Sequence, residues 1–169
     1  VVSHASCPVV VVREDNHVTD STKYGPVVVG VDGSEVSQKA TAYAFREAQA
    51  RGAALIAVHT WMDMQVQASL AGLSAAQSEW ADIEKEQSEL LTENLKEPRE
   101  EYPEVEVKKL ITRDRPVSAL TEAAEGAQLL VVGSHGRGGF KGMLLGSTSR
   151  ALLQSAPCPM MVVRPDEES

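Results

Sequence analysis

Short apolar runs alternate with stretches whose apolar residues recur at helical spacing. The runs are rich in valine, isoleucine and leucine. An unbroken β-branched run such as 27–31 is typical of a strand buried on both faces of a sheet. The pattern predicts five strands, at 27–31, 54–61, 105–112, 128–133 and 160–164.

The intervening stretches predict four helices. Ser34 is expected to cap the first helix and Gly52 to end it. A long helix is expected from Ala75, with Pro98 ending or kinking it. Its apolar face is predicted to carry Trp80, Ile83, Gln87, Leu90, Leu91 and Leu95. In the third helix Asp114 is the candidate cap and Pro116 the candidate first residue, and a fourth is expected to begin at Ser147 and stop before Pro157.

This alternation predicts an α/β fold, a doubly wound five-stranded parallel sheet with helices on both faces. In such sheets ligands bind beyond the carboxyl ends of the strands, where the strand order reverses. Asp32, Thr60 and Gly133 all lie at such ends. They are therefore the first candidates for a binding site.

The beginning and the end of the chain resemble each other. The segment "ASCPVVVVRE" (5–14) is similar to "SAPCPMMVVRP" (155–165). Coincidence is one explanation, since proline followed by valines is common. The alternative divides the chain into a terminal strand left from a preceding repeat (1–14), a linker (15–25), the main domain (26–165) and a tail (166–169).

Composition narrows the classes of partner. The 169 residues carry a formal net charge of −8, which argues against nucleic acid as the main partner. No apolar run is long enough to span a membrane, and the N-terminal segment does not resemble a signal peptide. We therefore expect a cytoplasmic protein. Cys7 and Cys158 are too few for a disulfide framework and are expected to be buried thiols.

A glycine-rich loop follows the fourth expected strand. Half of the twelve glycines lie between residues 133 and 146. Backbone amides can surround a phosphate where no side chain blocks the approach, and a helix N-terminus favours negative charge. Ser147 and Thr148 add hydroxyl groups, and Arg137 and Lys141 add positive charge. The loop thus predicts phosphate binding, the alternative being a flexible surface loop whose glycines serve only turns.

The loop matches neither of two common phosphate motifs. A Walker motif needs Gly-Lys, which the chain lacks, and the spacing of a G-x-G-x-x-G fingerprint fails at Lys141. What fits is Gly133-x-x-Gly136, then nine residues, then Gly146-Ser147. With "VVVGVDGS", "AVHTW" and "APCPMMVVRP", this pattern resembles the ATP-binding branch of the universal stress protein family over residues 26–165.

The resemblance implies a Rossmann-like fold of the adenine-nucleotide alpha hydrolase type, with ATP held between the first and fourth strands. It implies that Val31 and Asp32 lie near adenosine, with the Asp32 carboxylate close to ribose or Mg²⁺, and that Thr60 meets adenine through its backbone. The residues implied to hold the phosphates are Gly133, Gly136, Gly146, Ser147 and Thr148, with Arg137 inside the loop but outside the shared spacing. The segment "TRDRP" departs from the family, where glycine often precedes the proline.

The resemblance also implies assembly through the fifth strand. We expect a homodimer, or a pseudo-dimer within one tandem chain, in which Pro8 to Arg13 pairs antiparallel with Met160 to Arg164.

A nucleotide-dependent regulatory module in stress response is the function we expect. The alternatives are a slow ATP hydrolase or transferase using the same residues, and a dimerisation scaffold with a vestigial site. Turnover needs a base and a firm metal site, and the sequence offers Asp32 and little else. His59, Trp61 and Trp80 are interpreted as packing residues, and His135 as a loop residue. For Asp32 the rival interpretation is a cap on the first loop.

Overall fold

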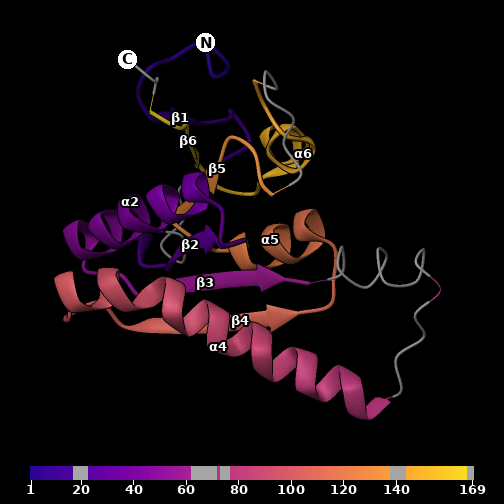
Figure 1. The fold of residues 1–169 in the computed structure, drawn as a ribbon. Coiled ribbons are helices and arrows are strands. Elements are labelled where there is room, and N and C mark those ends of the chain that lie inside the picture. The colour runs from indigo at the N-terminus through magenta and orange to yellow at the C-terminus, as the bar shows by residue number, and fades with distance from the viewer. Residues whose placement is uncertain (17–22, 62–71, 73–76, 138–143, 167–169) are drawn as a thin grey trace.

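A single sheet organises the molecule. The computed structural model describes residues 1–16, 23–61, 72, 77–137 and 144–166. In these ranges the strands follow the order β1-β6-β5-β2-β3-β4 (Figure 1). They are β1 (Val9–Val11), β2 (Val27–Gly30), β3 (Leu55–Thr60), β4 (Val107–Thr112), β5 (Leu129–Gly133) and β6 (Met160–Val163).

The expected α/β architecture is confirmed, but the expected count of five strands is wrong. Strands β2 to β6 are parallel, as predicted. The sixth, β1, joins the edge strand β6 antiparallel, with Val9 opposite Val162 and Val11 opposite Met160. Antiparallel pairing of residues 8–13 with 160–164 was predicted, in a homodimer or in a pseudo-dimer within one chain, and the pairing is confirmed for Val9–Val11. Within this one chain it already supplies hydrogen-bond partners to the backbone of β6, which would otherwise be an open edge.

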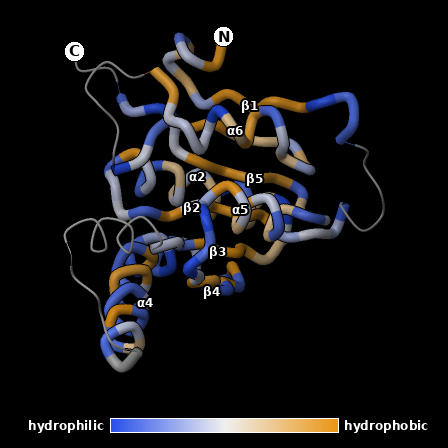
Figure 2. The backbone as a smooth tube through the Cα atoms, turned by 90° about the vertical axis from the view of Figure 1, so that its right-hand side faces the viewer, coloured by the Kyte–Doolittle hydropathy of each residue, from blue (hydrophilic) through white to orange (hydrophobic). Residues whose placement is uncertain are grey.

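Helices cover both faces of the sheet. They are α2 (Glu35–Arg51), α4 (Gln77–Glu101), α5 (Pro116–Ala124) and α6 (Ser147–Ser155). Alternate residues of each central strand point to opposite faces, so Val27 and Val29 pack beneath α2 while Val28 packs beneath α5. Figure 2 shows the apolar central strands β2 and β5, and α4 with apolar and polar residues alternating along its length.

Helix α2 begins and ends where the sequence predicts. The Ser34 side chain accepts a hydrogen bond from Ser37 N at 3.2 Å, and Gly52 adopts a left-handed conformation with φ 61°. Gly52 N–H then donates to Gln49 O at 3.1 Å, which satisfies a terminal carbonyl of the helix.

Three details of the other helices correct the sequence analysis. Pro98 lies inside α4, which continues to Glu101 because the following turn is intact and Tyr102 N donates to Pro98 O. Leu90 was expected on the apolar face of α4 but is 42% exposed. The expected start of this helix at Ala75 lies outside the described residues. Arg115, not Asp114, is the N-cap of α5, and it makes no side-chain capping bond.

The topology places a strand-order reversal beside β2. From β2 the chain proceeds to β3 and β4 on one side, then crosses to β5 and β6 on the other. Strands β2 and β5 are neighbours in parallel register, with Val29 opposite Val131. The carboxyl ends of β2 and β5 therefore form the edge at which ligands bind in sheets of this kind.

Candidate functional site

Asp32 is fixed above the N-terminus of α2. Its carboxylate Oδ1 accepts a hydrogen bond from Ser34 N at 2.8 Å, and its own N–H donates to Ser37 Oγ at 3.0 Å. A carboxylate that bonds the amide two residues on forms an Asx turn, which holds the loop after the strand. The interpretation of Asp32 as a loop cap is thus confirmed, and only one of its oxygens is used in this way.

The second oxygen of Asp32 joins the first loop to the glycine-rich loop. Arg137 N donates to Asp32 Oδ2 at 3.2 Å. A Cβ on Gly136 would lie 2.5 Å from the same oxygen, too close for any side chain. Gly33, with φ +80°, likewise leaves room for the Arg137 guanidinium, whose Nη2 would lie 2.7 Å from an added Cβ. Asp32 and Arg137, 105 positions apart in sequence, therefore meet at the β2–β5 edge.

The end of β5 is tied to the start of α6. Ser149 Oγ donates to Gly133 O at 2.6 Å, and Gly146 N donates to Ser134 O at 2.6 Å. A Cβ on Gly146 would lie 3.1 Å from His135 Cα. These contacts require the backbone to pass close to itself here, which explains the glycine at position 146.

The N-terminus of α6 differs from that of α2. Gly146 is the N-cap, so no side chain caps the first amides of α6, whereas Ser34 caps α2. Ser147 is exposed and Thr148 is half-buried at this end. Free amides and a helix dipole make such an end favourable for an anion. Gly138, Gly139, Lys141 and Gly142 lie outside the described residues.

The expected adenosine side of the edge is formed by buried, hydrogen-bonded residues. Val31 is 4% exposed, and its carbonyl oxygen is bonded to His59 Nδ1 at 2.7 Å. The other ring nitrogen of His59 lies 2.8 Å from Gln87 Oε1 on α4, so the histidine is a packing residue, as predicted. Thr60 is the last residue of β3 and pairs with Thr112 of β4.

The structure thus assembles some of the predicted site residues by direct contact and places the others nearby. Asp32, Gly136 and Arg137 meet, and Gly133 and Gly146 are bound to the same loop. Val31 and Thr60 lie one and two strands away from β5, at the same edge of the sheet.

The sequence analysis did not identify three serines and one glycine that stabilise the loops at this edge. The buried Ser37, Ser134 and Ser149 bind loop backbone, and Gly33 has a positive φ. The signal for Ser37 was present, because Ser34-x-x-Ser37 has the spacing of a capping pair. Nothing in the sequence marked Ser149, because its partner Gly133 is on a different element.

The described residues contain no cluster of metal ligands, and of the two cysteines one is buried and one is exposed. Among the described residues no group of three or more His, Cys, Asp and Glu could hold a metal ion. Burial raises the pKa of the Cys158 thiol to about 11, although a backbone hydrogen bond involving Leu130 opposes the rise. Cys7 is exposed, so the expectation of a buried thiol is wrong there and correct only for Cys158. No helix in the described ranges combines the length and the apolar character needed to cross a membrane.

The fold and the β2–β5 edge define a doubly wound α/β domain with an uncapped helix N-terminus beside its strand-order reversal. The profile of the universal stress protein family matches residues 23–164, and the chain belongs to this family. It is 46% identical over 163 residues to the universal stress protein Rv2005c of Mycobacterium tuberculosis, covering 96% of this chain and 53% of that protein. The chain therefore spans about half the length of such relatives.

Solved structures agree with this assignment. Universal stress protein UspA from Lactobacillus plantarum superposes with a TM-score of 0.67 at 23% identity, covering 83% of this chain and 98% of that one. A universal stress protein in complex with cAMP superposes with a TM-score of 0.53 at 26% identity, covering 83% of this chain and 97% of that one.

Proposed function

We propose that this domain binds ATP at the β2–β5 edge and acts as a nucleotide-dependent regulatory module in stress response. The observation that carries the proposal is the hydrogen bond from Arg137 N to Asp32 Oδ2. It holds the glycine-rich loop against the end of β2, while the uncapped amides of α6 and the Arg137 side chain supply positive potential beside it. The universal stress protein solved with cAMP supports an adenine nucleotide as the ligand class.

In this proposal each predicted residue keeps a definite role. The backbone at Gly133, Gly136 and Gly146 surrounds the phosphates, and Ser147 and Thr148 donate hydroxyl hydrogen bonds to them. Arg137 adds charge. Val31 and Thr60 line the adenosine side through their backbone, since Val31 itself is buried.

Mg²⁺ is compatible with the donors present, through Asp32 alone. Magnesium is usually bound by one or two carboxylates together with phosphate oxygens and water. Each Asp32 oxygen accepts one backbone hydrogen bond and has a further lone pair. We propose that Asp32 would hold Mg²⁺ jointly with the phosphates, where the ion would neutralise their charge.

Two measurements test the proposal. The purified protein is first denatured and the released small molecules are identified by mass spectrometry, and we expect adenine nucleotide. Calorimetric titration of nucleotide-free protein with ATP and with cAMP then gives the affinities. Gly146→Val should abolish ATP binding, because the added methyl groups would crowd His135 and the phosphate path. An unchanged affinity in that variant, with both proteins folded by circular dichroism, would refute the phosphate assignment.

The same samples separate a regulatory module from an enzyme. A regulatory module leaves the bound ATP chemically intact, whereas a slow hydrolase or phosphotransferase converts it to ADP. If chromatography shows that ADP forms faster with the protein than by spontaneous hydrolysis of ATP in buffer, the enzyme is favoured over the regulatory module. Saturable binding without ADP would retain it, and absence of binding would favour the scaffold.

We further propose that residues 1–14 represent the last strand of a preceding repeat, with 15–25 as linker. The pairing register has the symmetry that this requires. When Cys7 is aligned with Cys158, Val10 is equivalent to Met161, and these two residues face each other. The flanking pairs exchange equivalent positions, so a pseudo-twofold axis passes through the Val10–Met161 pair.

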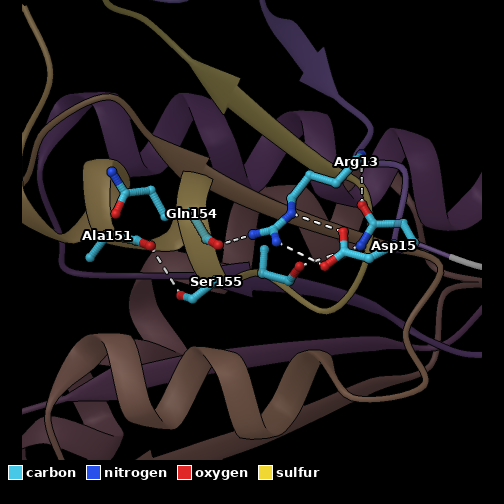
Figure 3. A network of polar contacts seen from close by, with 7 residues as sticks. Arg13, Asp15, Ala151, Gln154 and Ser155 are labelled. Carbon is cyan, nitrogen blue, oxygen red and sulfur yellow. Dashed lines mark hydrogen bonds and ion pairs between the residues drawn. The ribbon is translucent and has the colours of Figure 1, made fainter.

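Side-chain contacts follow this symmetry in part. Arg13 and Arg164 are equivalent in the two segments. Arg13 Nη1 donates to the carbonyl of Gln154, and Arg164 Nη1 donates to the carbonyl of Ala5 at 2.9 Å, although these two acceptors are not equivalent positions. Figure 3 shows Arg13 between Gln154 and Asp15, whose carboxylate accepts from Arg13 Nη2 at 2.8 Å. The symmetric register of the strand pair supports a pseudo-dimer through β6, in which a preceding domain or a second copy extends the sheet.

A further inference from the structure

A buried hydrogen-bond donor lies without a partner at the ligand edge of the sheet. Trp61 directly follows Thr60, the last residue of β3, and its backbone N–H donates to Thr112 O at 3.3 Å. The side chain is 1% exposed, and its indole Nε1 is buried with no hydrogen-bond partner among the residues that the structure describes. A buried N–H left unpaired costs about 1–3 kcal/mol.

Two other buried polar side chains at this edge are paired. Both nitrogens of His59 have partners, and Ser149 Oγ donates to Gly133 O. Arg164 Nε, just after β6, also lacks a partner among the described residues, but it lies three strands from β3, and its Nη1 donates to Ala5 O. An indole nitrogen only donates, so its missing partner must be an acceptor atom.

The indole is held firmly by two other side chains. The rings of Trp61 and Trp80 lie 5.7 Å apart at an interplanar angle of 32°. The Arg113 guanidinium lies over both rings, 5.0 Å from the centre of Trp61 and 5.7 Å from that of Trp80. Aromatic and cation–π contacts of this kind fix the ring plane. The donor is thus oriented before any ligand arrives.

The position of Trp61 in the sheet indicates which part of a ligand it faces. The phosphate-favouring N-terminus of α6 follows β5, and β3 lies two strand spacings from β5, roughly 10 Å away. In a nucleotide laid along this edge with its phosphates at α6, the ribose lies over β2 and the base reaches β3. Purine ring nitrogens are hydrogen-bond acceptors.

We propose that Trp61 is a specificity-determining residue of the nucleotide site, whose indole Nε1–H donates a hydrogen bond to a ring nitrogen of the purine base. Trp80 and Arg113 position the indole. The inference rests on the proposed function, because it needs the phosphates at α6. It assigns a ligand contact to Trp61, which the sequence analysis interpreted only as a packing residue.

The decisive experiment observes the donor directly. The chain has two tryptophans, so the unsubstituted protein gives two indole N–H signals in a ¹⁵N correlation spectrum, and the one absent from Trp61→Phe belongs to Trp61. The ¹⁵N-labelled unsubstituted protein is titrated with ATP and, separately, with tripolyphosphate, which has no base. We expect the Trp61 indole proton to move downfield with ATP and to stay in place with tripolyphosphate. A signal that stays in place at saturating ATP overturns the proposal.

Affinities give an independent measure. Trp61→Phe should weaken ATP binding about fivefold to tenfold, leave tripolyphosphate binding unchanged, and reduce the preference for ATP over CTP. Tyr102→Phe, which changes an aromatic side chain stacked on Phe45 and outside the proposed site, is the control and should change ATP affinity by less than about twofold. Equal loss for ATP and tripolyphosphate in Trp61→Phe would show a structural effect and overturn the proposal. Absence of saturable ATP binding to the unsubstituted protein would instead refute the proposed function, and the inference with it.

Discussion

Gly136→Ala tests whether the meeting of the two loops controls ATP binding. The backbone of Gly136 is not in the left-handed region, so alanine adds no backbone strain. The perturbation is therefore confined to one methyl group. That methyl would lie 2.5 Å from Asp32 Oδ2, which must move away.

The magnitude follows from the bonds that Asp32 would give up. Rotation of the carboxylate breaks the 3.2 Å bond from Arg137 N and strains the 2.8 Å bond from Ser34 N. A hydrogen bond to a charged group contributes about 1.5–3 kcal/mol. Because ATP binding must then restore the loop, the affinity should fall by about 1.4–2.8 kcal/mol, which is tenfold to hundredfold in Kd.

A double-mutant cycle isolates this contact. We expect Asp32→Ala to weaken ATP binding as well, and the double variant Asp32→Ala/Gly136→Ala to bind no worse than Asp32→Ala, because the clash disappears with the carboxylate. The assay is isothermal calorimetry on all four proteins, with denaturant unfolding to confirm that each is folded. Wild-type affinity in Gly136→Ala, or losses that simply add in the double variant, would refute the reasoning.

Three further outcomes are expected. Asp32→Ala should lower ATP affinity more in the presence of Mg²⁺ than in EDTA, and equal losses by calorimetry would remove the metal role. Deleting residues 1–14 opens the edge of β6 and should change the oligomeric state, so an unaltered mass by light scattering would contradict strand pairing as the determinant of assembly. The pKa of the Cys158 thiol is raised from 9.0 to about 11, so only the unfolded state ionises between these values. The contribution of Cys158 to the free energy of unfolding should then be constant well below pH 9 and fall by about 2.7 kcal/mol towards pH 11, so the profile should be flatter in Cys158→Ala.

Much of the fold could be predicted because its signals are local. The β-branched runs fixed the five parallel strands, and Ser34 and Gly52 marked the ends of α2. The prediction failed where a local signal competed with packing. Pro98 was expected to end or kink α4, and the ending is wrong, because the helix continues to Glu101, with Leu91 and Leu95 buried in the core beside α2.

The candidate site was predictable in outline and not in detail. Spacing brought Gly133, Gly136 and Gly146 to one loop, and strand ends brought Asp32 and Thr60 to one edge. The roles of Ser134 and Ser149 could not be predicted, since hydrogen bonds to backbone on another element leave no mark in a local pattern. The same is true of Trp61, whose missing partner is a property of its surroundings.

By itself, the sequence determined the alternation of strands and helices, the phosphate-type loop and the repeat of the terminal strand. These features depend on periodicity and on residue type, which are properties of neighbouring positions. Only the tertiary structure decided that Asp32 bonds the amide of Arg137, that Val10 lies opposite Met161 in the β1–β6 pair, and that the Trp61 indole N–H is buried without a partner among the described residues. Each depends on distances between residues far apart in the chain, and the sheet order sets those distances.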